Sequence, residues 1–210
     1  MLLTIASSAG PQNYNKLKLA EMAPYLDFFN LLAYDYAGSF GNVTGHQVNL
    51  YPSADNLLST PFFTDAAIRD YIKASVPVNK ITLGMPLYGR AFQQTDGMRK
   101  RFHGVSEGSF EKGIWDYKVL PQAGTVEQMD QQVGASYSWD EARKIIISYD
   151  TLASLNVKVH YIKNNKLGGG MFWELSGDRK DSGSLIDNVS LLTTTGYGVN
   201  ADAENRSFII

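Results

Sequence analysis

The chain has 210 residues, of which 44% are hydrophobic and 12% aromatic, and this length and composition predict a globular protein with one sizeable core. Its 19 Lys and Arg residues against 21 Asp and Glu residues give a formal net charge of −2 without a basic block, which argues against nucleic acid or a membrane surface as a partner. No apolar run reaches the roughly 20 residues of a membrane span, and the absence of cysteine excludes disulfides and thiolate metal ligands.

The predicted elements alternate between strand and helix along the chain. The opening MLLTIASSAG lacks the basic start and the long apolar run of a signal peptide, so it is predicted to hold a strand. Short apolar, β-prone runs predict strands at residues 2–6, 28–34, 80–89 and 168–175. Helical periodicity predicts helices at residues 16–26, 64–75, 151–165 and 185–192. Strands separated by helices favour parallel pairing, with the helices on the outside.

The helix at residues 64–75 carries the clearest signals. Thr64 is placed to cap its N-terminus. Four apolar residues share one face and are predicted to meet the core: Ala67, Ile68, Tyr71 and Ile72.

One long segment interrupts the alternation. Residues 91–148 are rich in glycine, aromatic and polar residues, contain short β-like pieces and are too many for a simple loop. They are predicted to form a small α+β insertion after the third strand. The prediction thereby divides the chain into four segments. Residues 1–90 hold three strands and their helices, and residues 91–148 form the insertion. Residues 149–195 hold the fourth strand and its flanking helices, and the tail at 196–210 is predicted to be disordered.

Polar residues gather where the predicted strands end. The second, third and fourth strands end with Tyr34-Asp35, with Tyr88 and Arg90, and with Trp173-Glu174. In a (β/α)8 barrel the chemistry lies at the carboxyl ends of the strands, so four β/α units with these ends favour half of such a barrel. An open, doubly wound sheet would produce the same alternation.

The second strand places successive residues on opposite faces. One face is apolar and is predicted to meet the helices: Phe29, Leu31 and Ala33. Tyr34 is then directed over the mouth of the barrel, and Asp35 joins it only if the strand ends there and the chain turns, which Gly38 permits. A phenol that donates and a carboxylate that accepts hydrogen bonds could together hold a polar ligand. The alternative is a pair that caps a loop or a helix.

Five motifs occur in the order and at the spacing of a known family: LLTIASSAGPQNYNKLKLAEM, FNLLAYDYAGSF, KITLGMPLYGRAF, GIWDYK and GGGMFWEL. Together they resemble the carboxyl-terminal half of glycoside hydrolase family 18 chitinases, of the fungal and bacterial-type branch, over about residues 2–195. The resemblance implies an α/β fold of the (β/α)8 TIM-barrel type. In that fold the four strands are strands 5–8, and the α+β insertion follows strand 7.

The resemblance also implies a role for each of five residues. Tyr34 matches a tyrosine that bonds the 2-acetamido group of the substrate, and Asp35 matches the neighbouring carboxylate that contacts the sugar. Arg90 and Glu111 match polar contacts from the insertion, and Trp173 matches the tryptophan under the sugar at the cleavage point. Considered singly, Trp173 is typical of a core residue and Arg90 of a surface ion pair.

The implied reaction is substrate-assisted, retaining hydrolysis of β-1,4-linked N-acetylglucosamine polymers, without a cofactor or metal. The catalytic acid of the family lies in a D-G-x-D-x-D-W-E motif that this sequence lacks. We therefore expect a carboxyl-terminal fragment that binds sugar and is inactive alone. The alternatives are a chitinase-like lectin, which binds chitooligosaccharides without cleavage, and a (β/α)-type enzyme with a non-saccharide substrate.

The expected partners are chitin or chitooligosaccharides. The parent protein is expected to be an extracellular monomer.

Overall fold

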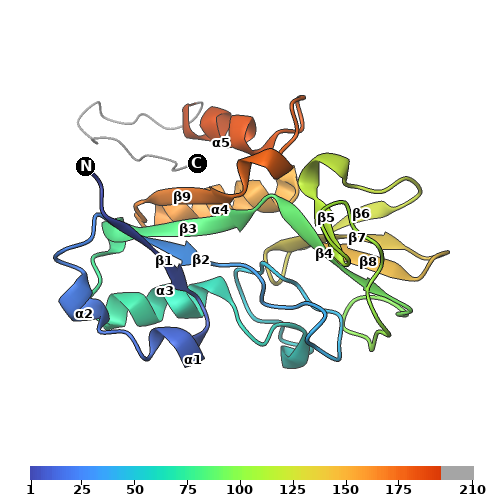
Figure 1. The fold of residues 1–210 in the computed structure, drawn as a ribbon, viewed down its shortest axis with the longest axis horizontal. Coiled ribbons are helices and arrows are strands. Elements are labelled where there is room, and N and C mark those ends of the chain that lie inside the picture. The colour runs from blue at the N-terminus through green and yellow to red at the C-terminus, as the bar shows by residue number, and fades with distance from the viewer. Residues whose placement is uncertain (195–210) are drawn as a thin grey trace.

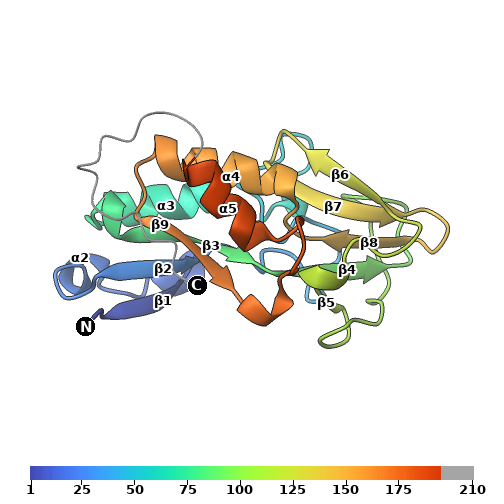
Figure 2. The same ribbon diagram turned by 90° about the horizontal axis from the view of Figure 1, so that it is seen from above.

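The computed structural model describes residues 1–194 as a mixed α/β molecule, and the predicted tail at 196–210 lies outside the described residues. Two sheets lie side by side along its long axis (Figures 1 and 2). The first is a parallel sheet in the order β1-β2-β3-β9, made of β1 (Thr4–Ser8), β2 (Phe28–Leu32), β3 (Ile81–Pro86) and β9 (Gly169–Trp173). The parallel pairing predicted from the alternation is confirmed.

Three long helices share a hydrophobic core with this sheet: α3 (Thr64–Lys73), α4 (Leu152–Asn164) and α5 (Leu185–Thr194). Phe29, Leu31 and Ala33 are fully buried in that core, and the Phe29 ring meets the edge of Tyr71 on α3 at a centroid distance of 6.0 Å. The predicted apolar face of β2 is confirmed. Within residues 1–194, none of the helices has the length and the apolar content that crossing a bilayer requires.

Two helix predictions need correction. The predicted helix at 16–26 is reduced to α2 (Leu19–Met22), which follows another short helix, α1 (Pro11–Tyr14). Pro24 has no backbone N–H and cannot donate the bond that would continue α2. In α3 the N-cap is Phe63 rather than Thr64, and the Thr64 hydroxyl instead donates to the Asn49 carbonyl at 3.1 Å.

The predicted core face of α3 is also smaller than expected. Ala67, Ile68 and Tyr71 are buried, but Ile72 is 43% exposed.

The connections between these elements also contain short 3-10 helices, at Leu57–Ser59, Val78–Lys80, Tyr117–Val119 and Leu175–Gly177.

The second sheet is antiparallel, in the order β5-β4-β8-β7-β6, and lies in the sequence between β3 and β9. Its strands are β4 (Tyr88–Gln93), β5 (Ile114–Asp116), β6 (Val126–Asp130), β7 (Ala135–Asp140) and β8 (Ile145–Ser148). The single strand predicted at 80–89 is therefore two strands in different sheets, with only Leu87 between them. The predicted boundary between residues 90 and 91 falls within β4.

The segment between β2 and α3 is rich in polar residues and glycine, yet its residues 44–50 are buried. We call residues 44–50 the buried loop. A buried loop must satisfy its backbone groups, and this one does so in part on connections within the second sheet. The Leu50 amide donates to the Val133 carbonyl at 2.9 Å, and the Thr44 amide donates to the Lys100 carbonyl at 2.8 Å.

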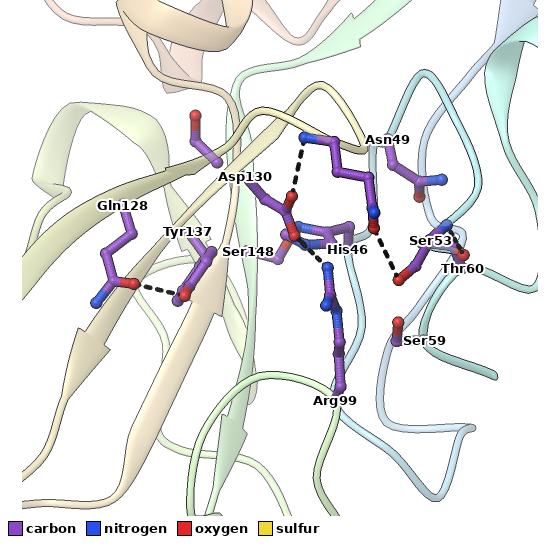
Figure 3. Close-up of polar contacts among 12 residues, drawn as sticks. His46, Asn49, Ser53, Ser59, Thr60, Arg99, Gln128, Asp130, Tyr137 and Ser148 are labelled. Atoms are coloured by element: carbon purple, nitrogen blue, oxygen red, sulfur yellow. Dashed lines mark hydrogen bonds and ion pairs between the residues drawn. The ribbon is translucent and has the colours of Figure 1, made fainter. Parts of the chain in front are cut away.

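An ionic cluster connects the buried loop to the second sheet (Figure 3). Arg99 donates to the Asp130 carboxylate at 2.6 Å, and the fully buried His46 places Nε2 3.4 Å from the same oxygen. The pKa of Asp130 lies below its usual value, mainly because of the hydrogen bond with His46 and also because of the charge of Arg99, while burial opposes the shift. The cluster ties the loop to β6.

We expect Asp130→Asn to lower the free energy of unfolding by about 1 kcal/mol at pH 7 and by much less near pH 3. A carboxyl whose folded pKa is depressed contributes stability above its unfolded pKa, near 4, and loses that contribution as the pH falls through the folded pKa. Urea unfolding at both pH values measures the difference. Asp96→Asn is the control, because the Asp96 side chain is 87% exposed. An equal loss at both pH values would contradict an ionic role for Asp130.

Candidate functional site

The turn that follows β2 builds the centre of the site. Asp35 lies three residues beyond the end of β2 with a φ of 63°, in the left-handed region that aspartate tolerates better than most residues. Its Oδ1 accepts hydrogen bonds from the Tyr88 hydroxyl and from Arg90 Nε, each at 2.6 Å. The predicted turn therefore occurs at Asp35 itself, before Gly38 is reached.

The two donors come from the other sheet. Tyr88 and Arg90 are two residues apart in β4 and so project from the same face. Burial and then the charge of Asp35 raise the pKa of Tyr88, so the phenol stays protonated and donates. Asp35 Oδ2 has no hydrogen-bond partner within residues 1–194, and the Asp35 side chain is 40% exposed. One oxygen of a firmly held carboxylate is thus available to a ligand.

Tyr34 lies beside this group. Its ring meets the Tyr88 ring edge-on at a centroid distance of 6.2 Å. Burial and then the charge of Asp35 raise the pKa of the half-buried Tyr34 phenol, and its hydroxyl has no hydrogen-bond partner in the described part of the chain. The hydroxyl is therefore a neutral donor with no acceptor of its own.

Trp173, the last residue of β9, is 56% exposed, which is unusual for so large an apolar side chain at the end of a buried strand. It borders a pocket of about 220 Å³ that Asp35 and Arg90 also line. The remaining lining residues come from both sheets and their connections: Leu87, Tyr88, Phe110, Ile114, Asp116, Glu174 and Gly177. The structure thus brings Asp35, Arg90 and Trp173 together, with Tyr34 next to Tyr88 at one side.

Glu111 is placed differently from the other predicted site residues. Its side chain is exposed and is not part of the pocket lining, although its carbonyl accepts the Ile114 amide at 2.8 Å. Glu111 therefore lies at the rim, one residue from the pocket-lining Phe110.

Several lining residues were given no role by the sequence. Tyr88 was noted only as a strand-end residue, and its spacing of two from Arg90 is the signal that could have identified it. Asp116 is paired with Tyr88 across β4 and β5, a register that the sequence does not reveal. Glu174 was likewise noted only as a strand-end residue, and Phe110 carries no comparable signal.

The pocket combines a carboxylate acceptor and an exposed aromatic face, and the neutral phenol donor of Tyr34 lies next to the lining residue Tyr88. This combination suits a ligand that carries hydroxyl or N–H groups on one side and an apolar surface on another.

Comparisons with known proteins agree on one family. The model of glycosyl hydrolases family 18 matches residues 1–178. Chitinase 1 of Aphanocladium album is 53% identical over 208 residues, which make up 99% of this chain and 48% of that protein. The chain spans about half the length of the curated relatives it matches.

Solved structures give the same result. A chitinase from Bacillus thuringiensis superposes with a TM-score of 0.85 at 28% identity, covering 96% of this chain and 37% of that one. A family 18 chitinase from Cycas revoluta, solved in complex with (GlcNAc)4, superposes with a TM-score of 0.75 at 25% identity, covering 91% of this chain and 54% of that one.

Proposed function

The chain belongs to family 18 of the glycosyl hydrolases, and we propose that it supplies the sugar-binding part of an active site that hydrolyses chitin. The observation that carries the proposal is one pocket lined by the Asp35 carboxylate, which Tyr88 and Arg90 hold, and by the exposed indole of Trp173. A sugar ring needs this combination, because its hydroxyl and N–H groups seek acceptors and its apolar face packs on aromatic rings.

The fold is the TIM-barrel type of the family 18 chitinases. We infer that β1, β2, β3 and β9 are strands 5–8 of an eight-stranded barrel and that residues 88–148 form an insertion after strand 7. Three features support this inference: the four strands are parallel neighbours, β1 and β9 are the two edges of the sheet, and the antiparallel sheet lies between β3 and β9 in the sequence.

Each site residue has a role in this proposal. Asp35 Oδ2 accepts a hydrogen bond from a hydroxyl or N–H of the sugar, and Arg90 fixes the carboxylate that does so. The Tyr34 hydroxyl donates to the acetamido oxygen and keeps it near the anomeric carbon. Trp173 stacks under the ring, and Glu111 contacts a longer saccharide from the rim.

The proposed reaction is substrate-assisted and retaining. The acetamido oxygen forms a bond to the anomeric carbon while the glycosidic C–O bond breaks, and the departing oxygen takes a proton from a carboxylic acid. Water then opens the cyclic intermediate. Because the D-G-x-D-x-D-W-E motif does not occur in the 210 residues, the proposal gives this chain the task of positioning and assigns proton donation to residues outside it.

Binding and turnover test the proposal separately. We expect the 210-residue chain to bind (GlcNAc)4 in a calorimeter. We also expect it to cleave a fluorogenic chitobioside about 100-fold to 10,000-fold more slowly than the Aphanocladium album relative. An absence of binding would contradict the sugar-binding role, and cleavage at the rate of the relative would contradict the missing proton donor.

The same assay on a longer parent protein distinguishes an enzyme from a lectin, since a lectin would bind without cleaving. We also propose that the parent protein is an extracellular monomer that acts on chitin or chitooligosaccharides.

Trp173→Ala is expected to weaken (GlcNAc)4 binding about tenfold, because the stacking surface is lost. The free energy of unfolding should change by no more than about 0.5 kcal/mol, because the indole is more than half exposed. Calorimetric titration and urea unfolding measure the two effects. Tyr25→Ala removes an aromatic ring that is 79% exposed and lies outside the pocket lining, so it is the matched control. Equal affinity for Trp173→Ala and the wild type would exclude stacking.

A further inference from the structure

Gln47 lies in the buried loop and bonds to both halves of the site. Its side chain is fully buried, and its Nε2 donates to the Tyr88 carbonyl at 2.9 Å and to the Ser148 carbonyl at 3.0 Å. Its backbone amide donates to the Ser148 hydroxyl at 3.0 Å. Its own carbonyl accepts the amide of Tyr36, the residue after Asp35, at 3.0 Å. One residue thus connects the chain beside Asp35 to the strand that carries Tyr88 and Arg90.

The side-chain nitrogen of Gln47 continues the hydrogen bonding at the end of the β4–β8 pair in the second sheet. The pairing of β4 with β8 ends at Arg90 and Ser148, so the Tyr88 carbonyl lies beyond the last paired position. Gln47 Nε2 supplies donors to that carbonyl and to the Ser148 carbonyl. Gln47 Oε1, in contrast, is buried without a partner among the described residues. The orientation is therefore determined by the two donor bonds, which neither a carboxylate nor a thioether could make.

These contacts matter because Asp35 and its two hydrogen-bond donors, Tyr88 and Arg90, belong to different sheets. Asp35 follows β2 of the parallel sheet, whereas its partners Tyr88 and Arg90 belong to β4 of the antiparallel sheet. A small displacement of one sheet relative to the other lengthens both 2.6 Å bonds and moves the oxygen that the ligand meets. We propose that Gln47 is a positioning residue that sets the distance between Asp35 and its partners Tyr88 and Arg90; its effect on sugar binding rests on the proposed function.

The chain offers a closely matched control. Asn49 is also fully buried in the same loop, and its Nδ2 donates to two backbone carbonyls, those of Tyr51 at 2.9 Å and Phe62 at 3.0 Å. Its Oδ1 is likewise buried without a partner in the described part of the chain. Neither Tyr51 nor Phe62 lines the pocket. Gln47→Met and Asn49→Leu therefore remove the same kind of interaction, and only the first removes it beside the site.

The first measurement needs no ligand. The Hε proton of Arg90, observed by NMR, reports the bond from Nε to Asp35, and its exchange with solvent should be about tenfold faster in Gln47→Met than in the wild type. Asn49→Leu should leave this exchange rate unchanged while lowering thermal stability by a similar amount. Equal exchange rates in Gln47→Met and Asn49→Leu would overturn the proposal.

The second measurement is the affinity for (GlcNAc)4. Gln47→Met should weaken binding about tenfold, the size of one misplaced charge-assisted hydrogen bond, and Asn49→Leu should not weaken it. When Asp35 is already alanine, Gln47→Met should have no further effect on affinity, because it acts through Asp35. Additive losses would overturn the proposal. If the wild type does not bind the sugar, the proposed function fails, and the Arg90 exchange rate still decides the role of Gln47.

Gln47→Glu provides a second test of the proposal if the Gln47→Met variant does not fold. It keeps the size of the side chain, but its carboxylate would meet two carbonyl oxygens, and only the protonated acid could donate to one of them. The Arg90 exchange rate in this variant should therefore rise with pH more steeply than in the wild type. A pH dependence equal to that of the wild type would contradict the need for a donor at this position.

Discussion

Asp35→Ala is expected to reduce the affinity for (GlcNAc)4 about 100-fold, the largest loss at the site. The substitution removes the oxygen proposed to meet the sugar, and it also removes the acceptor shared by Tyr88 and Arg90. Hydrogen bonds to charged groups contribute about 1.5–3 kcal/mol each, and about 1.4 kcal/mol corresponds to a factor of ten in affinity. Calorimetric titration measures the loss directly.

Asp96→Asn is the matched control for this experiment, because it changes an 87% exposed aspartate that is not part of the pocket lining. Its affinity should equal that of the wild type. Asp35→Asn should lie between the two, since the amide keeps one acceptor oxygen. Binding by Asp35→Ala within about twofold of the wild type would show that the sugar does not use this carboxylate.

Lys158→Met is expected to lower the free energy of unfolding by about 3–5 kcal/mol, the largest effect on stability. Lys158 Nζ lies 2.6 Å from Asp150 Oδ2, and the two side chains are 1% and 0% exposed. Burial lowers the pKa of Lys158, and the charge of Asp150 opposes this shift. Without the ammonium group, Asp150 keeps the hydroxyl of Ser154 as a donor but carries an uncompensated buried charge. Urea unfolding with linear extrapolation measures the change.

The double variant Lys158→Met/Asp150→Asn should be more stable than Lys158→Met alone, because no charge then remains in the core. Lys73→Met, at the exposed end of α3, should change stability by no more than about 0.5 kcal/mol. A double variant as unstable as the single variant would mean that lost packing, and not the unpaired charge, causes the effect.

The sequence predicted those parts of the fold and the site that depend on local pattern. The alternation along β2 identified the buried face of Phe29, Leu31 and Ala33, because side-chain direction in a strand follows from position alone. The resemblance named Asp35, Arg90 and Trp173, which the structure brings to one pocket. The turn after β2 was attributed to Gly38, since glycine is the usual signal for a turn, but the chain turns at Asp35 itself, with a φ of 63°.

Features that depend on tertiary contacts could not be predicted. The run KITLGMPLYG is continuous in its pattern, so nothing local marks the change of sheet after Pro86. Gln47 lies in a segment whose composition is typical of an exposed loop, and it is buried because it contacts strands β4 and β8 of the second sheet. Glu111 was assigned by resemblance alone, and its side chain lies outside the pocket lining.

The position of the second sheet within the chain has a consequence for the order of folding. β3 pairs with β9, although the whole antiparallel sheet and α4 lie between them in the sequence. Contacts between nearby segments form faster than contacts that close long loops, so the hairpins of the second sheet should form before β9 joins β3. Trp173 reaches the pocket only with β9. The pocket is therefore expected to assemble in a late step of folding, after the bonds of Asp35 to β4 have become possible.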